Sequence, residues 1–365
     1  MKRSGRMAVR VMSGEVFDVL IVGLGPGGAS AALAAASAGL SVLAVDKRRK
    51  IGEPVQCAEF VPLPLSRHAR SAVVQNITGM QSVLPSGIRE HSDFPGLMID
   101  RAAFDQALAT QASSAGALLQ SQTTLKGLDR DGRFALLQGA NGESVRAQYR
   151  VLIAADGPHS AVARSLGLAP LATVETRQYR MPLLHPYADT DIWLSDEFPG
   201  GYGWLFPKGS VANIGVGADL RFVANLKAPL ERLCASLVSE GTVGPAVLSR
   251  TGGAIPVGGM RLPLVHENIV FVGDAAGLTH PITGAGIASA VVSGERAGQA
   301  AAAYVGGAMD ALTGYAEEMQ DEFEDSLARA VSRRQWLMER WHTPAAHLDA
   351  THKRGWIAFS EYFAA

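Results

Sequence analysis

The sequence predicts an α/β protein in which a parallel sheet with crossover helices is interrupted by a second, antiparallel sheet and followed by a helical tail. A buried strand, a glycine-rich turn, a helix and another buried strand follow one another over Phe17–Asp46. Between Val174 and Val257 the chain changes to short, aromatic-rich strands, and at Asn268–Val272 the buried-strand pattern resumes. An antiparallel domain inserted into a discontinuous parallel one explains this order.

The first strand, Phe17–Val22, is followed directly by the glycine-rich turn Gly23-Leu24-Gly25-Pro26-Gly27-Gly28. In this G-x-G-x-x-G pattern, Gly23 permits the tight turn, Gly25 lets a pyrophosphate approach the backbone, and Gly28 lets the helix pack close to the sheet. Because the pattern stands between a strand and a helix, it predicts a dinucleotide site.

The remainder of this unit supports the same interpretation. The expected helix, Ala29–Gly39, would present free amides and a positive dipole end to the phosphates. The second strand, Ser41–Asp46, ends in a carboxylate, which at this spacing accepts hydrogen bonds from the adenosine ribose. We assign Asp46 and the adjacent Lys47 to the nucleotide site.

Further elements continue the two domains. Asp100 is expected to cap a helix that follows it. Residues 121–147 alternate apolar and polar residues around the turns Asp131-Gly132 and Asn141-Gly142, which predicts an antiparallel meander. The remaining expected elements are buried strand 149–154, inserted-domain strands 191–194, 202–206 and 210–217, helix 226–237, and a small-residue helix that follows Gly273-Asp274 and runs to about Ala303. Acidic residues precede basic ones after 316, which favours a solvated helix face.

Two later motifs stand in the order and at the spacing typical of one flavoprotein group. They are Ala155–Ser160 (ADGPHS) and Val272–Gly277 (VGDAAG), the second continuing through Pro281, Gly284, Gly286 and Ile287. In these motifs the sequence resembles geranylgeranyl reductases and, more distantly, aromatic hydroxylases and flavin halogenases. The resemblance implies a glutathione-reductase-like FAD-binding Rossmann domain with an inserted, aromatic-hydroxylase-like substrate domain.

The same resemblance implies FAD as cofactor and suggests roles for individual residues. Asp274 would bind the ribityl hydroxyls, and the helix that begins near Gly284 would aim its amide end at the isoalloxazine. Arg101 would lie over the phosphates or the ribityl chain. For Asp156, a turn-forming role and direct ligation both remain open. The cofactor contacts implied by these motifs are Arg101, Asp156, Gly273, Asp274, Pro281, Gly284, Gly286 and Ile287.

The inserted domain contains the most specific motif. Pro199–Pro207 (PGGYGWLFP), followed after seven residues by Gly215-Val216-Gly217, matches the geranylgeranyl reductase pattern P-x-x-Y-x-W-x-F-P-x7-G-x-G. Alternation places Tyr202, Trp204 and Phe206 on one strand face, where they would form the wall of a cavity for an apolar substrate. An aromatic core stripe is the structural alternative. Lys208 fits a surface charge better than a catalytic one.

The segment Gly52–Glu59 (GEPVQCAE) resembles the reductases' G-x-P-V-R-C-G-E loop, which lies against the flavin in that family. Gln56 replaces the family's Arg, and Ala58 its Gly. The lost positive charge should weaken stabilisation of an anionic reduced flavin, and the added bulk reshapes the pocket. Cys57 is a candidate flavin-side proton donor, a covalent participant or a small buried hydrophobe, whereas Cys234 is expected in the core.

Composition excludes several classes of function. The 33 Lys and Arg against 34 Asp and Glu leave a net charge of -1, so nucleic acid is an unexpected partner. The nine His show no metal-ligand spacing, and two Cys are too few for a disulfide framework. No uninterrupted run of ~18 apolar residues predicts a transmembrane segment. With no secretory signal in residues 1–15, we expect a cytoplasmic protein, and a peripheral membrane contact remains open.

We therefore expect an FAD domain formed by residues 14–62, 97–173 and 264–305, a substrate domain formed by 63–96 and 174–263, and C-terminal helices over 306–365. The candidate catalytic residues are Cys57, Tyr202, Trp204 and Phe206.

Two enzymatic hypotheses follow. The first is hydride transfer from reduced flavin to a double bond of a long, isoprenoid-type substrate. The alternative is a monooxygenase that hydroxylates an aromatic ring, including a Trp or Tyr of a partner protein during quinone-cofactor maturation. Either would need a transient electron donor, NAD(P)H or a ferredoxin-like carrier. A flavin-bound accessory protein without activity is the third reading.

Overall fold

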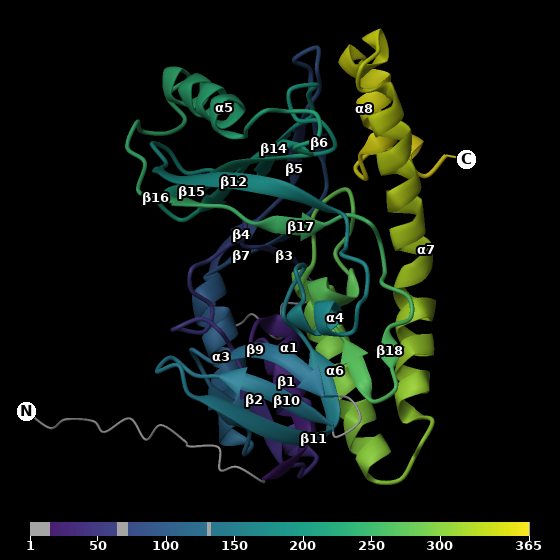
Figure 1. The fold of residues 1–365 in the computed structure, drawn as a ribbon. Helices are drawn as coiled ribbons and strands as arrows, with labels where there is room; N and C mark the ends of the chain where they lie inside the picture. The colour runs from purple at the N-terminus through teal and green to yellow at the C-terminus, as the bar shows by residue number, and fades with distance from the viewer. Residues whose placement is uncertain (1–14, 64–71, 130–132, 365) are drawn as a thin grey trace, which may run out of the picture.

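The computed structural model describes residues 15–63, 72–129 and 133–364, which form two stacked lobes with a long helix beside them (Figure 1). The predicted turn Asp131-Gly132 and residue 14, where the FAD domain was expected to begin, lie outside the described residues, as does part of the segment 63–96. The lower lobe in Figure 1 contains the parallel sheet, and the upper lobe contains most of the antiparallel strands.

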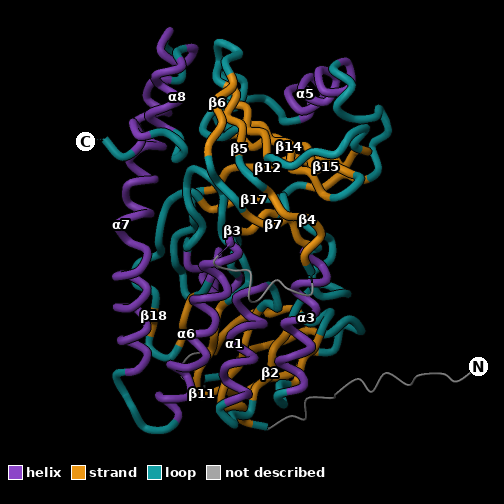
Figure 2. The backbone as a smooth tube through the Cα atoms, turned by 180° about the vertical axis from the view of Figure 1, so that it is seen from behind, coloured by secondary structure: helices purple, strands orange, loops and turns teal. Residues whose placement is uncertain are grey.

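The lower lobe is organised around a sheet whose central strands are parallel. In spatial order the strands are β18 (Val265–His266), β19 (Ile269–Phe271), β11 (Ser144–Ala154), β1 (Val16–Val22), β2 (Val42–Val45) and β8 (Leu118–Gln120), with β10 (Phe134–Gln138) and β9 (Thr124–Asp129) joined to β11. The helices of this lobe are α1 (Pro26–Ser37), α3 (Arg101–Ser114), α4 (Ala161–Ser165) and α6 (Ile287–Val305). α1, α3 and α6 lie together on one face of the sheet (Figure 2). Because helices cover it, β2 is buried at all four positions, as its continuous apolar sequence predicts.

The predicted βαβ unit is confirmed, with one change at the start of its helix. α1 begins at Pro26 rather than Ala29, because proline at the first helical position needs no hydrogen-bond acceptor for its nitrogen. Asp100 caps α3 as predicted, since its carboxylate accepts a 2.9 Å hydrogen bond from the Ala103 amide. The meander is also confirmed, but its last strand and the predicted buried strand form one continuous strand, β11. β11 pairs antiparallel with β10 and parallel with β1 and β19.

The upper lobe contains a second sheet built from two separated parts of the chain. Its strands, in spatial order, are β16 (Ser249–Thr251), β12 (Thr173–Pro182), β15 (Val211–Ala218), β14 (Gly203–Lys208), β13 (Thr190–Trp193), β5 (Met80–Val83) and β6 (Arg89–Ser92), and β17 (Ala254–Pro256) also pairs with β12. The helix α5 (Lys227–Ser239) packs on this sheet through Leu230 and Leu237. A three-stranded sheet consists of β3 (Phe60–Pro62), β7 (Gly96–Ile99) and β4 (Val73–Ile77).

One strand pair in the upper sheet departs from the predicted antiparallel arrangement. β13 pairs in parallel with β5, although the other pairs in this sheet are antiparallel. β5 belongs to a chain segment more than one hundred positions before β13, so no tight hairpin constrains their relative direction. The joining of β5 and β6 to strands of the later segment supports the proposed discontinuous domain, whose boundaries stay a prediction.

The C-terminal part of the chain is helical and runs along both lobes. Its elements are the α-helices α7 (Ala311–Arg340) and α8 (Asp349–Gly355) and the 3-10 helices η3 (Pro344–His347) and η4 (Ser360–Tyr362), whereas the 3-10 helix η2 (Gly273–Ala276) belongs to the lower lobe, directly after β19. The helix expected after Gly273 is therefore interrupted: a single 3-10 turn and a loop precede α6.

The long helix α7 extends beside both lobes (Figures 1 and 2). It contacts the lower lobe through Tyr315, whose hydroxyl donates to the Phe271 carbonyl, and the upper lobe through Arg334, whose guanidinium donates to the Gly200 carbonyl. The predicted solvated face is confirmed for its acidic residues, which are exposed, but Leu312, Met319 and Arg334 are buried. Of the helices that the structure describes, none has the length and apolar character to cross a bilayer.

Candidate active site

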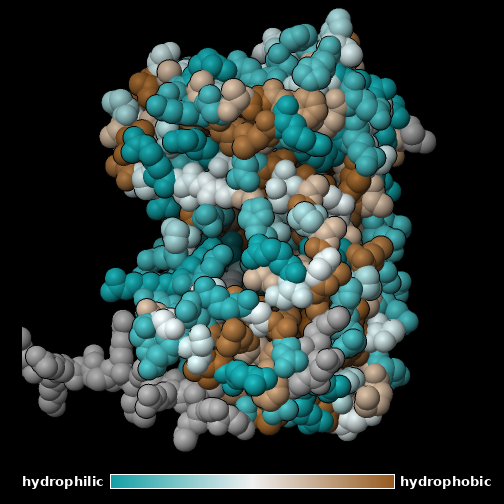
Figure 3. All heavy atoms as spheres, in the orientation of Figure 1, coloured by the Kyte–Doolittle hydropathy of each residue, from teal (hydrophilic) through white to brown (hydrophobic). Residues whose placement is uncertain are grey.

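A cavity of about 960 Å³ lies between the lobes, at the upper end of the ~300–1,000 Å³ range of small-molecule sites. Figure 3 shows that the surface is hollowed between the upper and the lower lobe. The predicted site residues on its wall are Gly23, Gly25, Asp46, Lys47, Cys57, Arg101, Asp156, Tyr202, Trp204, Phe206, Gly273, Asp274, Pro281, Gly284, Gly286 and Ile287. The fold thus gathers residues from almost the whole chain around one space.

Gly28 is the exception, because it does not line the cavity. A Cβ at Gly28 would lie 1.9 Å from the Gly23 carbonyl oxygen, so this glycine lets α1 pack against the turn after β1 and is not a ligand contact. Gly23 has φ +103°, a left-handed conformation that favours glycine. A Cβ at Gly25 would meet no atom within 4 Å, so its open side faces the space available to a ligand.

Two helices begin at the cavity wall. α1 starts after Gly25 and α6 after Gly286, and neither N-terminus is capped by a side chain. The first amides of a helix have no acceptor within the helix, and together they carry partial positive charge. Both helices therefore present donors to an anionic or electron-rich ligand in the cavity.

Two carboxylates line the cavity at the ends of parallel strands. Asp46 accepts hydrogen bonds from the Leu24 amide at 2.8 Å and the Arg48 amide at 2.7 Å, and its oxygens retain further acceptor capacity. Asp274 accepts a 2.6 Å hydrogen bond from the Thr279 hydroxyl, and burial raises the pKa of Asp274. Both side chains are suited to accept hydrogen bonds from ligand hydroxyls.

The structure shows the turn-forming role of Asp156, and direct ligation stays a prediction. Its Oδ2 accepts hydrogen bonds from the Ala161 and Val162 amides at 2.6 and 3.1 Å, which anchors the first turn of α4. Its Oδ1 is buried and has no hydrogen-bond partner in the described protein, and the residue lies on the cavity wall. Since an unsatisfied buried acceptor is costly, a ligand donor at this position is expected.

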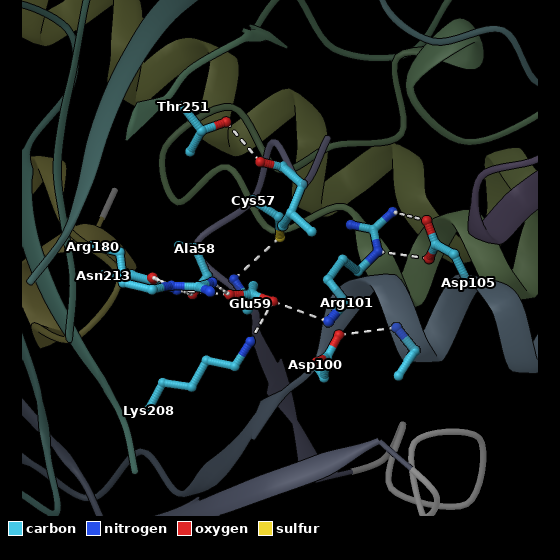
Figure 4. A network of polar contacts seen from close by, with 12 residues as sticks. Cys57, Ala58, Glu59, Asp100, Arg101, Asp105, Arg180, Lys208, Asn213 and Thr251 are labelled. Carbon is cyan, nitrogen blue, oxygen red and sulfur yellow. Dashed lines mark hydrogen bonds and ion pairs between the residues drawn. The ribbon is translucent and has the colours of Figure 1, made fainter. Parts of the chain in front are cut away.

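Cys57 lies on the cavity wall beside Arg101 (Figure 4). The Glu59 amide donates to Cys57 Sγ at 3.2 Å. Burial raises the pKa of the Cys57 thiol, although the Arg101 guanidinium opposes this shift. Burial also disfavours the Arg101 charge, but the Asp105 carboxylate, 2.7 Å away, holds the pKa of Arg101 above its usual value. The thiol is therefore protonated at neutral pH.

A buried ion cluster centred on Glu59 holds the Cys57 loop in place (Figure 4). Glu59 is fully buried, and its carboxylate accepts hydrogen bonds from Lys208 Nζ at 2.7 Å and Arg180 Nη2 at 2.8 Å. Asn213 Nδ2 and the Arg101 amide donate to the same carboxylate at 2.9 and 3.0 Å. The surface-charge reading of Lys208 is therefore wrong: its side chain is 9% exposed because Glu59 compensates its charge.

The aromatic motif forms part of the wall, and its polar atoms are tied to neighbouring loops. The Tyr202 hydroxyl donates to the Thr283 carbonyl, and Trp204 Nε1 donates 3.0 Å to Gln178 Oε1. Gln178 Nε2 donates 3.1 Å to the Cys57 carbonyl, which links the aromatic strand to the Cys57 loop. The Tyr202 and Trp204 rings are 5.7 Å apart in an edge arrangement.

These rings belong to a larger apolar chamber at one end of the cavity. We define this apolar chamber by the residues Phe60, Met80, Phe94, Ile192, Tyr202, Trp204, Phe206, Ile282 and Trp356, which line the cavity and pack in one hydrophobic cluster. The sequence left open whether Tyr202, Trp204 and Phe206 form a cavity wall or an aromatic core stripe. In the structure they do both, because they pack in the hydrophobic cluster and also line the cavity.

Sequence reasoning missed several residues of the wall. Gln178 has no motif of its own, His280 precedes Pro281 without being assigned, and Trp356 lies in the C-terminal tail, in which no site residue was predicted. Glu59 ends the GEPVQCAE segment, and that position in the motif was the signal that could have identified it. His280 Nδ1 accepts from the Ile282 and Thr283 amides at 3.4 and 3.3 Å, and burial lowers the pKa of His280 to about 4.

The residues present fit FAD. Two uncapped helix N-termini and the open side of Gly25 face a cavity of suitable volume. Asp156, whose buried Oδ1 has no partner in the described protein, lies on the wall of the same cavity. Asp46 and Asp274 lie on the same wall and supply acceptors for the hydroxyls of such a ligand. The apolar chamber continues from this polar part, so cofactor and apolar substrate can share one cavity.

Comparison with known proteins gives consistent relatives. The model of the family "FAD dependent oxidoreductase" matches residues 18–151. The digeranylgeranylglycerophospholipid reductase of Thermoplasma volcanium is 34% identical over 311 residues, which cover 78% of each chain. A geranylgeranyl bacteriochlorophyll reductase-like protein of Thermoplasma acidophilum has a similar structure, with a TM-score of 0.84, 30% identity, and coverage of 95% of this chain and 93% of that one.

A flavin-dependent brominase has a TM-score of 0.70 at 18% identity, covering 90% of this chain and 88% of that one, and is similar in fold alone. These neighbours confirm the predicted fold class, an FAD-binding Rossmann-type domain with a second sheet domain and C-terminal helices.

Proposed function

Because this chain belongs to the digeranylgeranylglycerophospholipid reductase family of FAD-dependent oxidoreductases, we propose that it saturates double bonds in the isoprenoid chains of a glycerophospholipid. The proposed substrate carries long hydrocarbon chains on a polar headgroup. FAD is the cofactor, and in its reduced form it supplies the hydride that one carbon of the double bond receives. A proton delivered to the other carbon completes the saturation.

The observation that supports this function most strongly is the apolar chamber inside the cofactor cavity. Phe60, Phe206 and Trp356 come from three distant parts of the chain and converge on one space together with Met80 and Ile192. Burial of a hydrocarbon against such a wall is favourable by roughly 25 cal/mol per Å² of apolar surface. A polyprenyl chain offers a large apolar surface and no hydrogen-bonding group, which suits this wall.

The aromatic strand is proposed to orient the chain. Tyr202 and Trp204 have their polar atoms bonded to Thr283 and Gln178, so their rings are fixed and only their apolar surfaces are available to a substrate. Fixed rings restrict the positions that a double bond can occupy, which lowers the entropic part of the barrier.

Cys57 is the proposed proton donor. Its thiol is protonated at neutral pH because burial raises its pKa, and the Glu59 amide fixes the position of the sulfur. Glu59 itself is held by Lys208 and Arg180, so the loop has little freedom to move. A positioned acid of this kind contributes typically about 100-fold or more to a rate.

An anaerobic experiment tests this function. Holoprotein reduced chemically, mixed with digeranylgeranylglycerophospholipid, should recover its oxidised flavin absorbance, and mass spectrometry should detect products with two more hydrogens per saturated double bond. Cys57→Ala should slow this oxidation about 100-fold or more, whereas Cys234→Ala, on the buried face of α5, should leave the rate unchanged. If the lipid never oxidises the flavin without oxygen, the proposal fails.

The same experiment with oxygen addresses the monooxygenase alternative, which the reductase relatives make the weaker hypothesis. A hydroxylated aromatic product that forms only with oxygen would favour it, including hydroxylation of a partner protein.

We further propose a transient electron donor, NAD(P)H or a ferredoxin-like carrier, and a cytoplasmic location peripheral to the membrane that holds the lipid. Stopped-flow reduction of the flavin by each donor would distinguish them.

A further inference from the structure

Trp356, which immediately follows α8, lies at the boundary of the apolar chamber. The residue is 3% exposed, and its ring centroid is 4.9 Å from that of Tyr202. It packs in the same cluster as Met80 and Ile192, and the next residue, Ile357, also lines the cavity. Its indole N–H is buried without a hydrogen-bond partner among the described residues, so the ring contributes volume rather than a polar contact to this wall.

The helix before Trp356 is anchored to the upper lobe. Asp349 accepts hydrogen bonds from the Ser86 amide at 3.0 Å and the Ser86 hydroxyl at 2.6 Å. Lys353 Nζ forms a 2.6 Å ion pair with Glu90. These contacts fix both ends of the short helix α8 to the segment that carries β5 and β6, so Trp356 has a defined position against the chamber.

The same tail is held from its other side by α7. A Cβ at Gly355 would lie 2.4 Å from Leu337 Cδ1, so glycine lets α8 approach α7 this closely without displacing the Leu337 side chain. Arg334 of α7 contacts Asp219 at 3.6 Å, and Trp341 Nε1 donates 3.0 Å to the Asp196 carbonyl. The wall that Trp356 forms is therefore braced, and a hydrocarbon chain that reaches it meets a fixed barrier.

We infer that Trp356 closes the apolar chamber and sets the length of the prenyl chain that the chamber accepts. This inference rests on the proposed function, because it names the residue that selects among prenyl substrates. The bulky indole occupies space that an additional isoprene unit of a longer chain would need. A smaller side chain would convert this barrier into an extension of the chamber.

The test is a series of prenyl glycerophospholipids with farnesyl, geranylgeranyl and farnesylgeranyl chains, each one isoprene unit longer than the last. In Trp356→Ala, the ratio of kcat/KM for the farnesylgeranyl lipid to that for the geranylgeranyl lipid should rise about tenfold. Trp356→Phe should give a smaller rise in this ratio, and it provides a second measurement if the alanine variant does not fold. Trp336→Ala is the matched control for loss of an indole that packs on α8: this tryptophan stacks with Arg340 and with Arg354 of α8 and is not on the cavity wall.

Binding of the fully saturated lipids separates this inference from the proposed reaction, because these lipids cannot be reduced. Measured by competition with a fluorescent lipid on the holoprotein, affinity should fall for the chain longer than the wild-type chamber and recover in Trp356→Ala. Such length selection, found together with no reduction of the unsaturated lipids, would overturn the proposed reaction and still support Trp356 as the barrier. An unchanged length preference in both Trp356 variants, or an equal shift in Trp336→Ala, would overturn the inference.

Discussion

The two ends of the cavity are built in different ways. At the cofactor end the wall is largely backbone, formed by the turns Gly23–Gly27, Gly273–Asp274 and Gly284–Ile287 at the ends of strands and the starts of helices. At the substrate end the wall is made of side chains such as Phe94 and Trp356, which belong to segments far apart in the sequence.

This difference explains why the cofactor end has a sequence signature. A backbone wall needs glycine at defined spacing, because a Cβ would occupy the space of the ligand or of a packed strand. A side-chain wall needs only apolar volume, which many residues supply. Local pattern therefore identifies the first kind of wall, and only tertiary contacts identify the second.

The largest expected effect is at the cofactor end, in Gly25→Val. Since a Cβ at Gly25 meets no protein atom within 4 Å, the apoprotein should fold with unchanged stability while the added side chain blocks the pyrophosphate. FAD binding should weaken at least about 1,000-fold, which corresponds to about 4 kcal/mol. Flavin absorbance of the purified protein and titration of the apoprotein with FAD measure this.

Gly28→Ala is the matched control for the same motif. Its Cβ would lie 1.9 Å from the Gly23 carbonyl oxygen, so it should lower the stability of the apoprotein itself, by about 3 kcal/mol. A Gly25→Val protein that stays yellow would show that the backbone wall does not face the cofactor.

The second-largest effect is expected at Glu59, in the ion cluster that lies between the cofactor end and the substrate end of the cavity. Glu59→Gln would leave Lys208 and Arg180 without a buried counter-charge and should lower the free energy of unfolding by about 3 kcal/mol, measured by urea denaturation. Lys208→Met leaves Glu59 paired with Arg180, so its free energy of unfolding should fall by less than that of Glu59→Gln. Equal losses in the two variants would contradict a cluster centred on the carboxylate.

The smallest effect is a pH dependence at His280, whose loop lies between the cofactor and substrate ends. Its folded pKa of about 4 lies below the ordinary value of 6.5, so the unfolded chain binds more protons in this window. The stability contribution of neutral His280 is thus complete above about pH 6.5 and is lost as pH falls towards 4, by about 2 kcal/mol after allowance for its partial exposure.

His280→Asn sharpens this measurement. The asparagine Oδ1 can still accept the Ile282 and Thr283 amides but does not titrate. Urea unfolding between pH 7 and 4.5 should show a weaker loss of stability in the variant than in the wild type. Parallel curves for the two proteins would mean that His280 is not the group that titrates.

Much of the fold could be predicted from local pattern. The strand–turn–helix–strand unit, the Asp100 cap and the meander follow from short-range periodicity and turn residues, and the structure contains each. The continuity of β11 and the parallel pairing of β13 with β5 could not be predicted, because they depend on which distant strands become neighbours.

The site shows the same limit. Except for Gly28, the predicted residues of the FAD motifs line one cavity. Cys57 and the aromatic strand line the same cavity. Lys208 was misread because charge in a sequence favours the surface, and only the folded chain brings the Glu59 carboxylate to its ammonium group.

By itself, then, the sequence determined the glycine-rich strand–turn–helix unit and the aromatic strand, because glycine spacing and alternation are local requirements. Tertiary structure alone decided where Glu59 finds its cations and that Trp356 closes the chamber. Those contacts join positions separated by more than one hundred residues, and no short stretch of sequence encodes such proximity.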